Sequence, residues 1–85
     1  MARHLVVGAG EVGTAVAAVL SRAHEVELRD VDPVDAIADV LDVCIPWSPE
    51  FPSIVQRYVT EHDADLVVVH STVPVGVCDA EGWVH

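Results

Sequence analysis

The stretch Leu5–Gly13, LVVGAGEVG, predicts the fold of this chain. Its first part belongs to the apolar, β-branched run His4–Val7, which is typical of a short buried strand. The glycine pattern G-x-G-x-x-G follows at once and opens a predicted helix from Glu11 to about Ser21. Apolar side chains recur there at helical spacing, at Val12, Ala15, Val16, Val19 and Leu20. Strand, glycine turn and helix in this order are typical of an α/β fold with a parallel sheet.

Strand-like and helical segments alternate over the rest of the chain. Further strands are predicted at Glu25–Asp30, Val40–Ile45 and Asp65–His70, and Trp83-Val84 is expected to begin a fifth. The Asp65–His70 strand is the most apolar of the set, so we expect it at the centre of the sheet, covered on both faces. Cap-and-proline pairs predict two more helices, from Asp32-Pro33 to about Ala38 and from Ser48-Pro49 to near His62.

These elements predict a single domain over residues 1–85. We expect a minimal Rossmann-like α/β domain of three layers, with a parallel sheet of four to five strands and helices on both faces.

The three glycines match the fingerprint of a dinucleotide site. In that arrangement Gly8 permits a tight turn, Gly10 lets the backbone approach a pyrophosphate, and Gly13 lets the helix pack closely on the strand. The phosphates would meet backbone N–H groups and the positive end of the helix, so no cationic side chain is needed. We expect the whole loop to bind the cofactor: Gly8, Ala9, Gly10, Glu11, Val12 and Gly13. The alternative is a glycine-rich turn without a ligand.

The second half of the fingerprint is an acid at the end of the second strand, about 20 residues further on. Asp30 stands there, 17 residues after Gly13, and can accept hydrogen bonds from the adenosine ribose hydroxyls. A carboxylate at this place would repel a 2′-phosphate, so NAD(H) is favoured as the cofactor over NADP(H). Arg29 is adjacent, but strand alternation turns its side chain to the opposite side.

Two more loops follow predicted strands at the edge where open α/β sheets bind ligands. Pro46 ends the third strand, and Trp47 after it either covers the adenine side of the cofactor or anchors packing. Ser71 and Thr72 either bond a nicotinamide ribose or a substrate hydroxyl, or cap a turn. His70 is either an acid or base, or a strand-end histidine bonded to a loop.

The residue types exclude several kinds of chemistry. The sequence contains no lysine and no asparagine, which excludes a phosphate-binding lysine, a Schiff base and a lysine general base within this chain. Its histidines lack metal spacing, its two cysteines are too few for a disulfide framework or a cysteine zinc site, and no serine lies in a G-x-S-x-G turn. Cys44 is expected in the core. We therefore assign no catalytic residue and no metal ligand.

The net charge of −10 argues against nucleic acid as a partner, because such binding depends on basic side chains. No apolar run approaches the roughly 18–20 residues that span a bilayer, and no signal peptide is evident, so a cytoplasmic protein is expected. An acid-rich surface without lysine suits a high-salt cytoplasm, because salt screens repulsion. The open edges of a small parallel sheet predict association with a second copy or a partner chain.

Two stretches carry a resemblance to a known family. The run Asp39–Pro46, DVLDVCIP, and the loop His70–Gly76, HSTVPVG, resemble the NAD-binding domain of the UDP-glucose/GDP-mannose dehydrogenase family and its 6-phosphogluconate-dehydrogenase-like relatives. In that family a similar proline ends the third strand, and an S-T-V-P-x-G-like loop follows the fourth.

The resemblance implies a nicotinamide-dependent oxidoreductase of a sugar nucleotide or a hydroxy acid. It implies that Gly8, Gly10, Gly13 and Asp30 contact the cofactor and that the loop 71–72 lies near the nicotinamide. The family's catalytic lysine, asparagine and cysteine lie in a later helical domain. We therefore expect a cofactor domain that is not a competent dehydrogenase by itself, with a partner chain supplying the substrate groups.

A different class is also similar over the first third of the chain. The glycine stretch 8–13 resembles the nucleotide-sensing regulator domains of potassium channels and transporters, which bind NAD(H) or ATP and catalyse nothing. The alternative function is therefore a regulatory module without a reaction.

Overall fold

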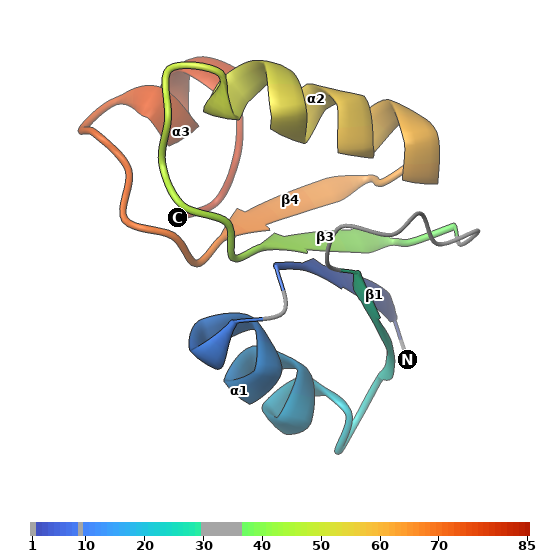
Figure 1. Cartoon of the computed structure of the whole chain (residues 1–85). Helices are drawn as coiled ribbons and strands as arrows, with labels where there is room; N and C mark the ends of the chain where they lie inside the picture. The colour runs from blue at the N-terminus through green and yellow to red at the C-terminus, as the bar shows by residue number, and fades with distance from the viewer. Residues whose placement is uncertain (1, 9, 30–36) are drawn as a thin grey trace.

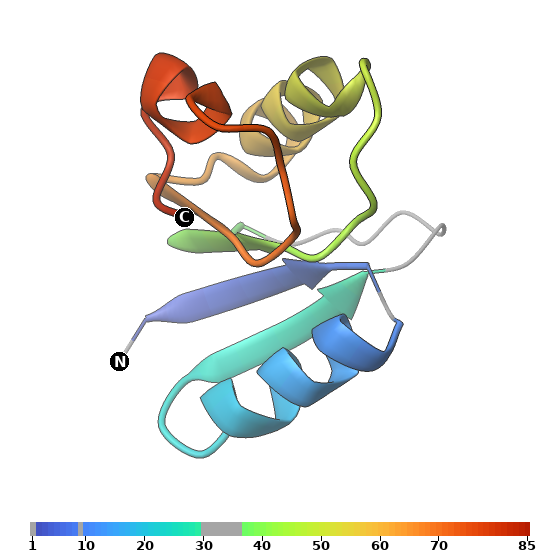
Figure 2. The same ribbon diagram turned by 90° about the vertical axis from the view of Figure 1, so that its left-hand side faces the viewer.

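The computed structural model describes residues 2–8, 10–29 and 37–85. The strands are β1 (Arg3–Val7), β2 (Glu25–Arg29), β3 (Val40–Val43) and β4 (Leu66–Val69), and the helices are α1 (Glu11–Leu20), α2 (Phe51–His62) and α3 (Val77–Glu81). All strand pairs are parallel, in the order β2-β1-β3-β4. Helix α1 lies on one face of the sheet, and α2 and α3 lie on the other (Figures 1 and 2). The predicted three-layer α/β architecture is confirmed.

The main core lies between the sheet and α2 with α3. Leu5, Leu41 and Val67 occupy paired positions on neighbouring strands and pack with Phe51 and Val55 of α2. Leu5, Leu41, Phe51 and Val55 are fully buried, which contributes about 1.5–3 kcal/mol for each side chain. Alternate residues of the same strands point to the face that carries α1.

The prediction that the Asp65–His70 strand lies at the centre of the sheet is wrong. Strands β1 and β3 are the inner strands, and β4 lies at the end of the four-stranded ladder. The apolar side chains of β4 differ in burial between its two faces: Val67 and Val69 belong to the core, whereas Leu66 on the other face is 43% exposed.

The predicted fifth strand is present as a single bridge. Val84 pairs in parallel with Val68: the Val69 N–H donates to the Val84 carbonyl at 2.7 Å, and the Val84 N–H donates to that of Val67 at 2.9 Å. The short helix α3, which the sequence analysis missed, leads into this bridge. Five residues are too few for helical periodicity to show in the sequence.

Several element boundaries differ from the prediction. Helix α2 begins at Phe51, because Ser48 starts a turn in which its carbonyl accepts a 2.9 Å bond from the Phe51 N–H. Its end at His62 agrees with the prediction. Ile37 and Ala38 are not helical, and the rest of the helix predicted from Asp32 lies outside the described residues. Among those that are described, no helix is both long and apolar enough to cross a membrane.

Candidate functional site

The glycine loop joins β1 to α1 through two close backbone contacts. Gly8 has a φ of +104°, and its N–H donates to the Arg29 carbonyl at 2.8 Å. A Cβ atom on Gly8 would lie 2.6 Å from the Cys44 carbonyl oxygen, and one on Gly13 would lie 1.6 Å from the Gly8 carbonyl oxygen. Neither position has room for a side chain: Gly8 lets the end of β1 approach the segment after β3, and Gly13 lets α1 approach the end of β1.

Gly10 differs from both, because it borders open space. A Cβ atom on Gly10 would meet none of the described atoms within 4 Å. Gly10 is the N-cap residue of α1 and has no side chain with which to cap the first N–H groups of this ten-residue helix. Such a helix end attracts anions. Glu11 is exposed in the first turn, and Ala9 lies outside the described residues.

A cleft of about 350 Å³ lies beside this loop, at the carboxyl ends of β3 and β4. The structure brings five of the predicted site residues together there: Val12, Pro46, Trp47, Ser71 and Thr72. Cys44, Ile45 and His70 complete the lining. Asp30, the predicted ribose ligand, lies outside the described residues.

Two of these cleft residues also have packing roles. Trp47 is 37% exposed, and its ring centroid lies 5.3 Å from that of Phe51, which anchors the loop to the core. The Ser71 hydroxyl donates to the Ile45 carbonyl and so ties the loop after β4 to the loop after β3. The serine proton is therefore used within the fold, while its oxygen retains acceptor capacity.

Arg29, the cation nearest to Asp30 in the sequence, is directed into the fold. Its Nη1 lies 2.7 Å from Nε2 of His62 and 3.0 Å from Oε1 of Glu61, and its guanidinium carbon lies 4.7 Å from the centre of the Tyr58 ring. The side chain is 9% exposed. These contacts hold the guanidinium against α2.

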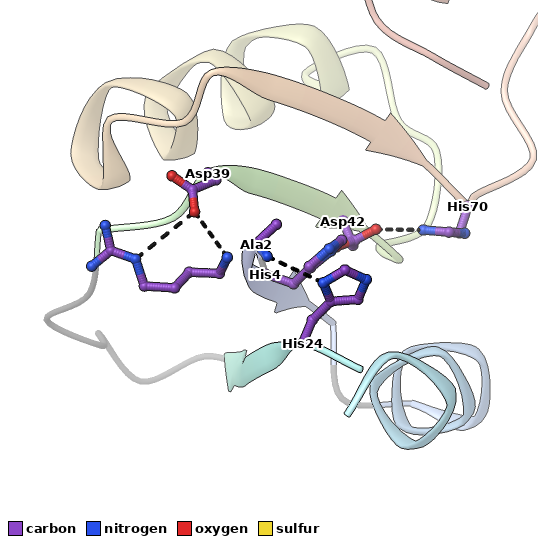
Figure 3. Close-up of polar contacts among 7 residues, drawn as sticks. Ala2, His4, His24, Asp39, Asp42 and His70 are labelled. Atoms are coloured by element: carbon purple, nitrogen blue, oxygen red, sulfur yellow. Dashed lines mark hydrogen bonds and ion pairs between the residues drawn. The ribbon is translucent and has the colours of Figure 1, made fainter. Parts of the chain in front are cut away.

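The sequence analysis missed a polar cluster on the α1 face of the sheet. His4 Nδ1 lies 2.6 Å from Oδ2 of Asp42, and His70 Nε2 lies 2.9 Å from Oδ1 of the same carboxylate (Figure 3). We call these three residues the His–Asp–His cluster. His70 is thus bonded to a strand carboxylate and not to a loop. The signal in the sequence was Asp42, an acid inside an otherwise apolar strand.

Cys44 lies one residue beyond β3 and is only half-buried, so its expected place in the core is wrong. Burial and, to a lesser extent, the negative charge of Asp42 raise the pKa of its thiol to about 11. At neutral pH the thiol is protonated and a poor nucleophile.

Two further observations concern the described residues outside this site. No group of three or more histidine, cysteine, aspartate or glutamate side chains among them is arranged to hold a metal ion. A larger hollow, of about 630 Å³, lies along β1 and β2 and is lined by Ile37, which directly follows the undescribed segment 30–36. It lies away from the glycine loop.

Comparisons of this chain with protein-family models, with curated proteins and with solved structures gave no match.

Proposed function

We propose that this chain binds NAD(H) at the glycine loop, as a cofactor domain similar to that of nucleotide-sugar and hydroxy-acid dehydrogenases. The observation that carries the proposal is the contrast within the loop. Gly8 and Gly13 are packed against backbone, whereas Gly10 opens to free space at the N-terminus of α1. A pyrophosphate can approach the chain there and accept hydrogen bonds from its N–H groups.

The strand order supports a site for both halves of the dinucleotide. The chain turns from β2 on one side of β1 to β3 on the other, and ligands of open α/β sheets bind at such a switch point. The adenosine half then lies towards β2, with Asp30 on its ribose. The nicotinamide half lies over the cleft, towards Trp47 and the loop 71–72. Trp47 is accordingly assigned to the nicotinamide half and not to the adenine.

The charges near this site favour NAD(H) over NADP(H). A 2′-phosphate would meet the carboxylate of Asp30. Arg29 would not compensate, because its guanidinium is engaged with His62, Glu61 and Tyr58.

We further propose that a partner chain supplies the catalytic groups. The resembled families use a lysine and an asparagine, and this chain contains neither residue type. The Cys44 thiol is protonated at neutral pH, so it does not take the place of the catalytic cysteine of the resembled family.

Calorimetric titration with NAD⁺, NADH, NADP⁺ and ATP tests the proposal. The wild-type chain is expected to bind NAD⁺ or NADH, and Gly10→Val is expected to weaken that binding at least roughly tenfold, because the side chain fills the approach of the pyrophosphate. The fold should persist by circular dichroism, since Gly10 has an extended φ of −74° that valine can adopt. Ala18→Val, at an exposed position of the same helix, is the matched control and should bind normally.

Asp30→Ala tests the ribose contact. Loss of the carboxylate is expected to weaken NAD⁺ binding by about 1–3 kcal/mol. An unchanged affinity would remove Asp30 from the site. No heat with any nucleotide would overturn the cofactor assignment, and binding of ATP alone would support the regulatory alternative.

A further inference from the structure

We infer that the His–Asp–His cluster makes the proposed cofactor site distinguish NAD⁺ from NADH in a pH-dependent way. This inference rests on the proposed function, because it requires the nicotinamide half of the dinucleotide to lie in the cleft beside His70.

The cluster connects the interior of the sheet to the wall of the cleft. The side chain of Asp42 is 3% exposed and that of His4 is 11% exposed, whereas that of His70 is 29% exposed. His70 also lines the cleft together with Ser71 and Thr72. A change of charge on the cluster therefore acts on a ligand in the cleft through His70, with less screening than a charge in open solvent.

Proton uptake changes the sign of the cluster's charge. With both imidazoles neutral, the carboxylate makes the cluster negative. One proton makes it neutral, and a second makes it positive. Histidine is the side-chain type whose change of charge ordinarily lies closest to neutral pH.

The two redox forms of the cofactor differ at the end that would lie beside His70. The oxidised nicotinamide ring carries a positive charge and the reduced ring carries none, while the phosphates and the adenosine are the same. A negative cluster thus favours the oxidised ring, and a positive cluster repels it. The reduced ring experiences neither effect.

Charged groups lie on the side of the cluster away from the cleft, where Arg3, Glu25 and Glu27 share a hollow with His4. The groups near His70 are apolar, neutral or can be distinguished by mutation. Next to His70, α1 contributes apolar side chains to a shared hollow, those of Ala15, Val16, Val19 and Leu20. Cys44, with its pKa raised to about 11, stays neutral below that pH. Two more imidazoles lie close. His85 Nε2 is 3.1 Å from the Ser71 carbonyl oxygen, and the His24 ring centroid is 4.8 Å from that of His4.

The experiment measures dissociation constants of the full chain for NAD⁺, NADH and ADP-ribose, which lacks nicotinamide, between about pH 5.5 and 8. The ratio of the NAD⁺ to the NADH constant is expected to rise roughly threefold to tenfold as the pH falls. The dissociation constant of ADP-ribose should change with pH as that of NADH does, because protons that act on the phosphates affect all three ligands alike.

Two variants assign the effect to the cluster. Asp42→Asn removes the negative charge and is expected to weaken NAD⁺ binding roughly threefold at pH 8 without changing NADH binding. Asp39→Asn is its matched control. The Asp39 carboxylate lies just before the start of β3, at the end away from the cleft, and accepts a hydrogen bond from the Arg3 N–H at 2.9 Å. His70→Gln is expected to flatten the pH dependence of the ratio, and His85→Gln is expected to leave it. If Asp42→Asn does not fold, the comparison of His70→Gln with His85→Gln tests the inference.

The outcomes separate the inference from the proposed function. A ratio that stays constant within twofold while all three ligands bind would overturn this inference alone. A pH dependence that His85→Gln removes and His70→Gln retains would also overturn it. Failure of all three ligands to bind at any pH would overturn the proposed function, and this inference with it.

Discussion

Gly10 and Gly13 stand three residues apart in one motif, yet they serve different purposes. The position of Gly13 admits no side chain, because a Cβ atom there would lie 1.6 Å from a backbone oxygen. The position of Gly10 admits one without a clash with the described residues. The fold therefore requires glycine at position 13 and not at position 10, where the proposed cofactor would approach the backbone. A motif search cannot make this distinction, since both glycines match the same pattern.

This difference predicts opposite results for two alanine substitutions. Gly13→Ala is expected to destabilise the protein by more than about 3 kcal/mol or to prevent folding, because α1 must move away from β1. Gly10→Ala is expected to cost at most about 1 kcal/mol, the usual penalty of a poorer N-cap residue. Urea denaturation followed by circular dichroism measures both. Equal stability losses would show that the close approach at Gly13 is not maintained in solution.

At the same scale, the His–Asp–His cluster was the hardest feature to predict. The glycine loop, Trp47 and Ser71 were singled out as candidates because each follows a predicted strand. Asp42 was not singled out, because its partners His4 and His70 stand 38 and 28 residues away in the sequence. Only parallel pairing of β1, β3 and β4 brings these three side chains together.

At the scale of elements, the end of α2 carries the one non-glycine residue with a positive φ among the described residues. Asp63, the C-cap residue, has φ 52° and ψ 44°, and its N–H donates to the Val59 carbonyl. The left-handed conformation ends the helix cleanly before β4. Glycine adopts it without steric cost, whereas aspartate does so with some strain and places a negative charge at the negative end of the helix.

Asp63→Gly is therefore expected to stabilise the protein by about 0.5–1 kcal/mol. This figure already includes the opposing cost of the greater conformational freedom that glycine gives the unfolded chain. Thermal denaturation at one salt concentration measures the change. Asp65→Gly, two residues further on and also exposed, removes the same charge at a position without a positive φ, and it should destabilise. A loss of stability in Asp63→Gly would contradict the strain argument.

Element type was easier to predict than element boundaries. Apolar runs located β1, β3 and β4, because these strands contribute side chains to the core, and polar–apolar alternation located β2, in which only Arg29 is buried. The start of α2 was placed too early, since a serine before a proline also suits the turn that precedes this helix. The position of β4 was misjudged, because an apolar run does not reveal how many strands lie on either side of it.

At the scale of the whole molecule, the most prominent feature is the excess of acidic over basic residues. The chain has 14 acids and four arginines, and at least two of those arginines are already engaged: Arg3 with Asp39 and Arg29 with Glu61. The exposed edge strand β2 carries Glu25 and Glu27, which discourage pairing with another strand. Repulsion among the acids destabilises the compact state, and dissolved salt screens it.

The melting temperature is therefore expected to rise by about 4–8 °C between low salt and molar potassium chloride, as relief of roughly 1 kcal/mol of repulsion would produce. Calorimetry or circular dichroism measures it. Sucrose at the same osmolality is the control, because it is excluded from the surface without screening charge. An equal rise in sucrose, or no rise in salt, would contradict a charge-based stabilisation.

The sequence by itself determined the α/β class, the glycine turn between β1 and α1, and the exclusion of lysine chemistry. Each of these depends on residues that are neighbours in the chain or on residue counts, so local sterics and composition suffice. The tertiary structure decided the strand order, the cleft beside the glycine loop, and the burial of Asp42 between two histidines. These depend on which strands pair, because the free energy of a buried charge or a packed glycine is set by atoms from distant parts of the chain.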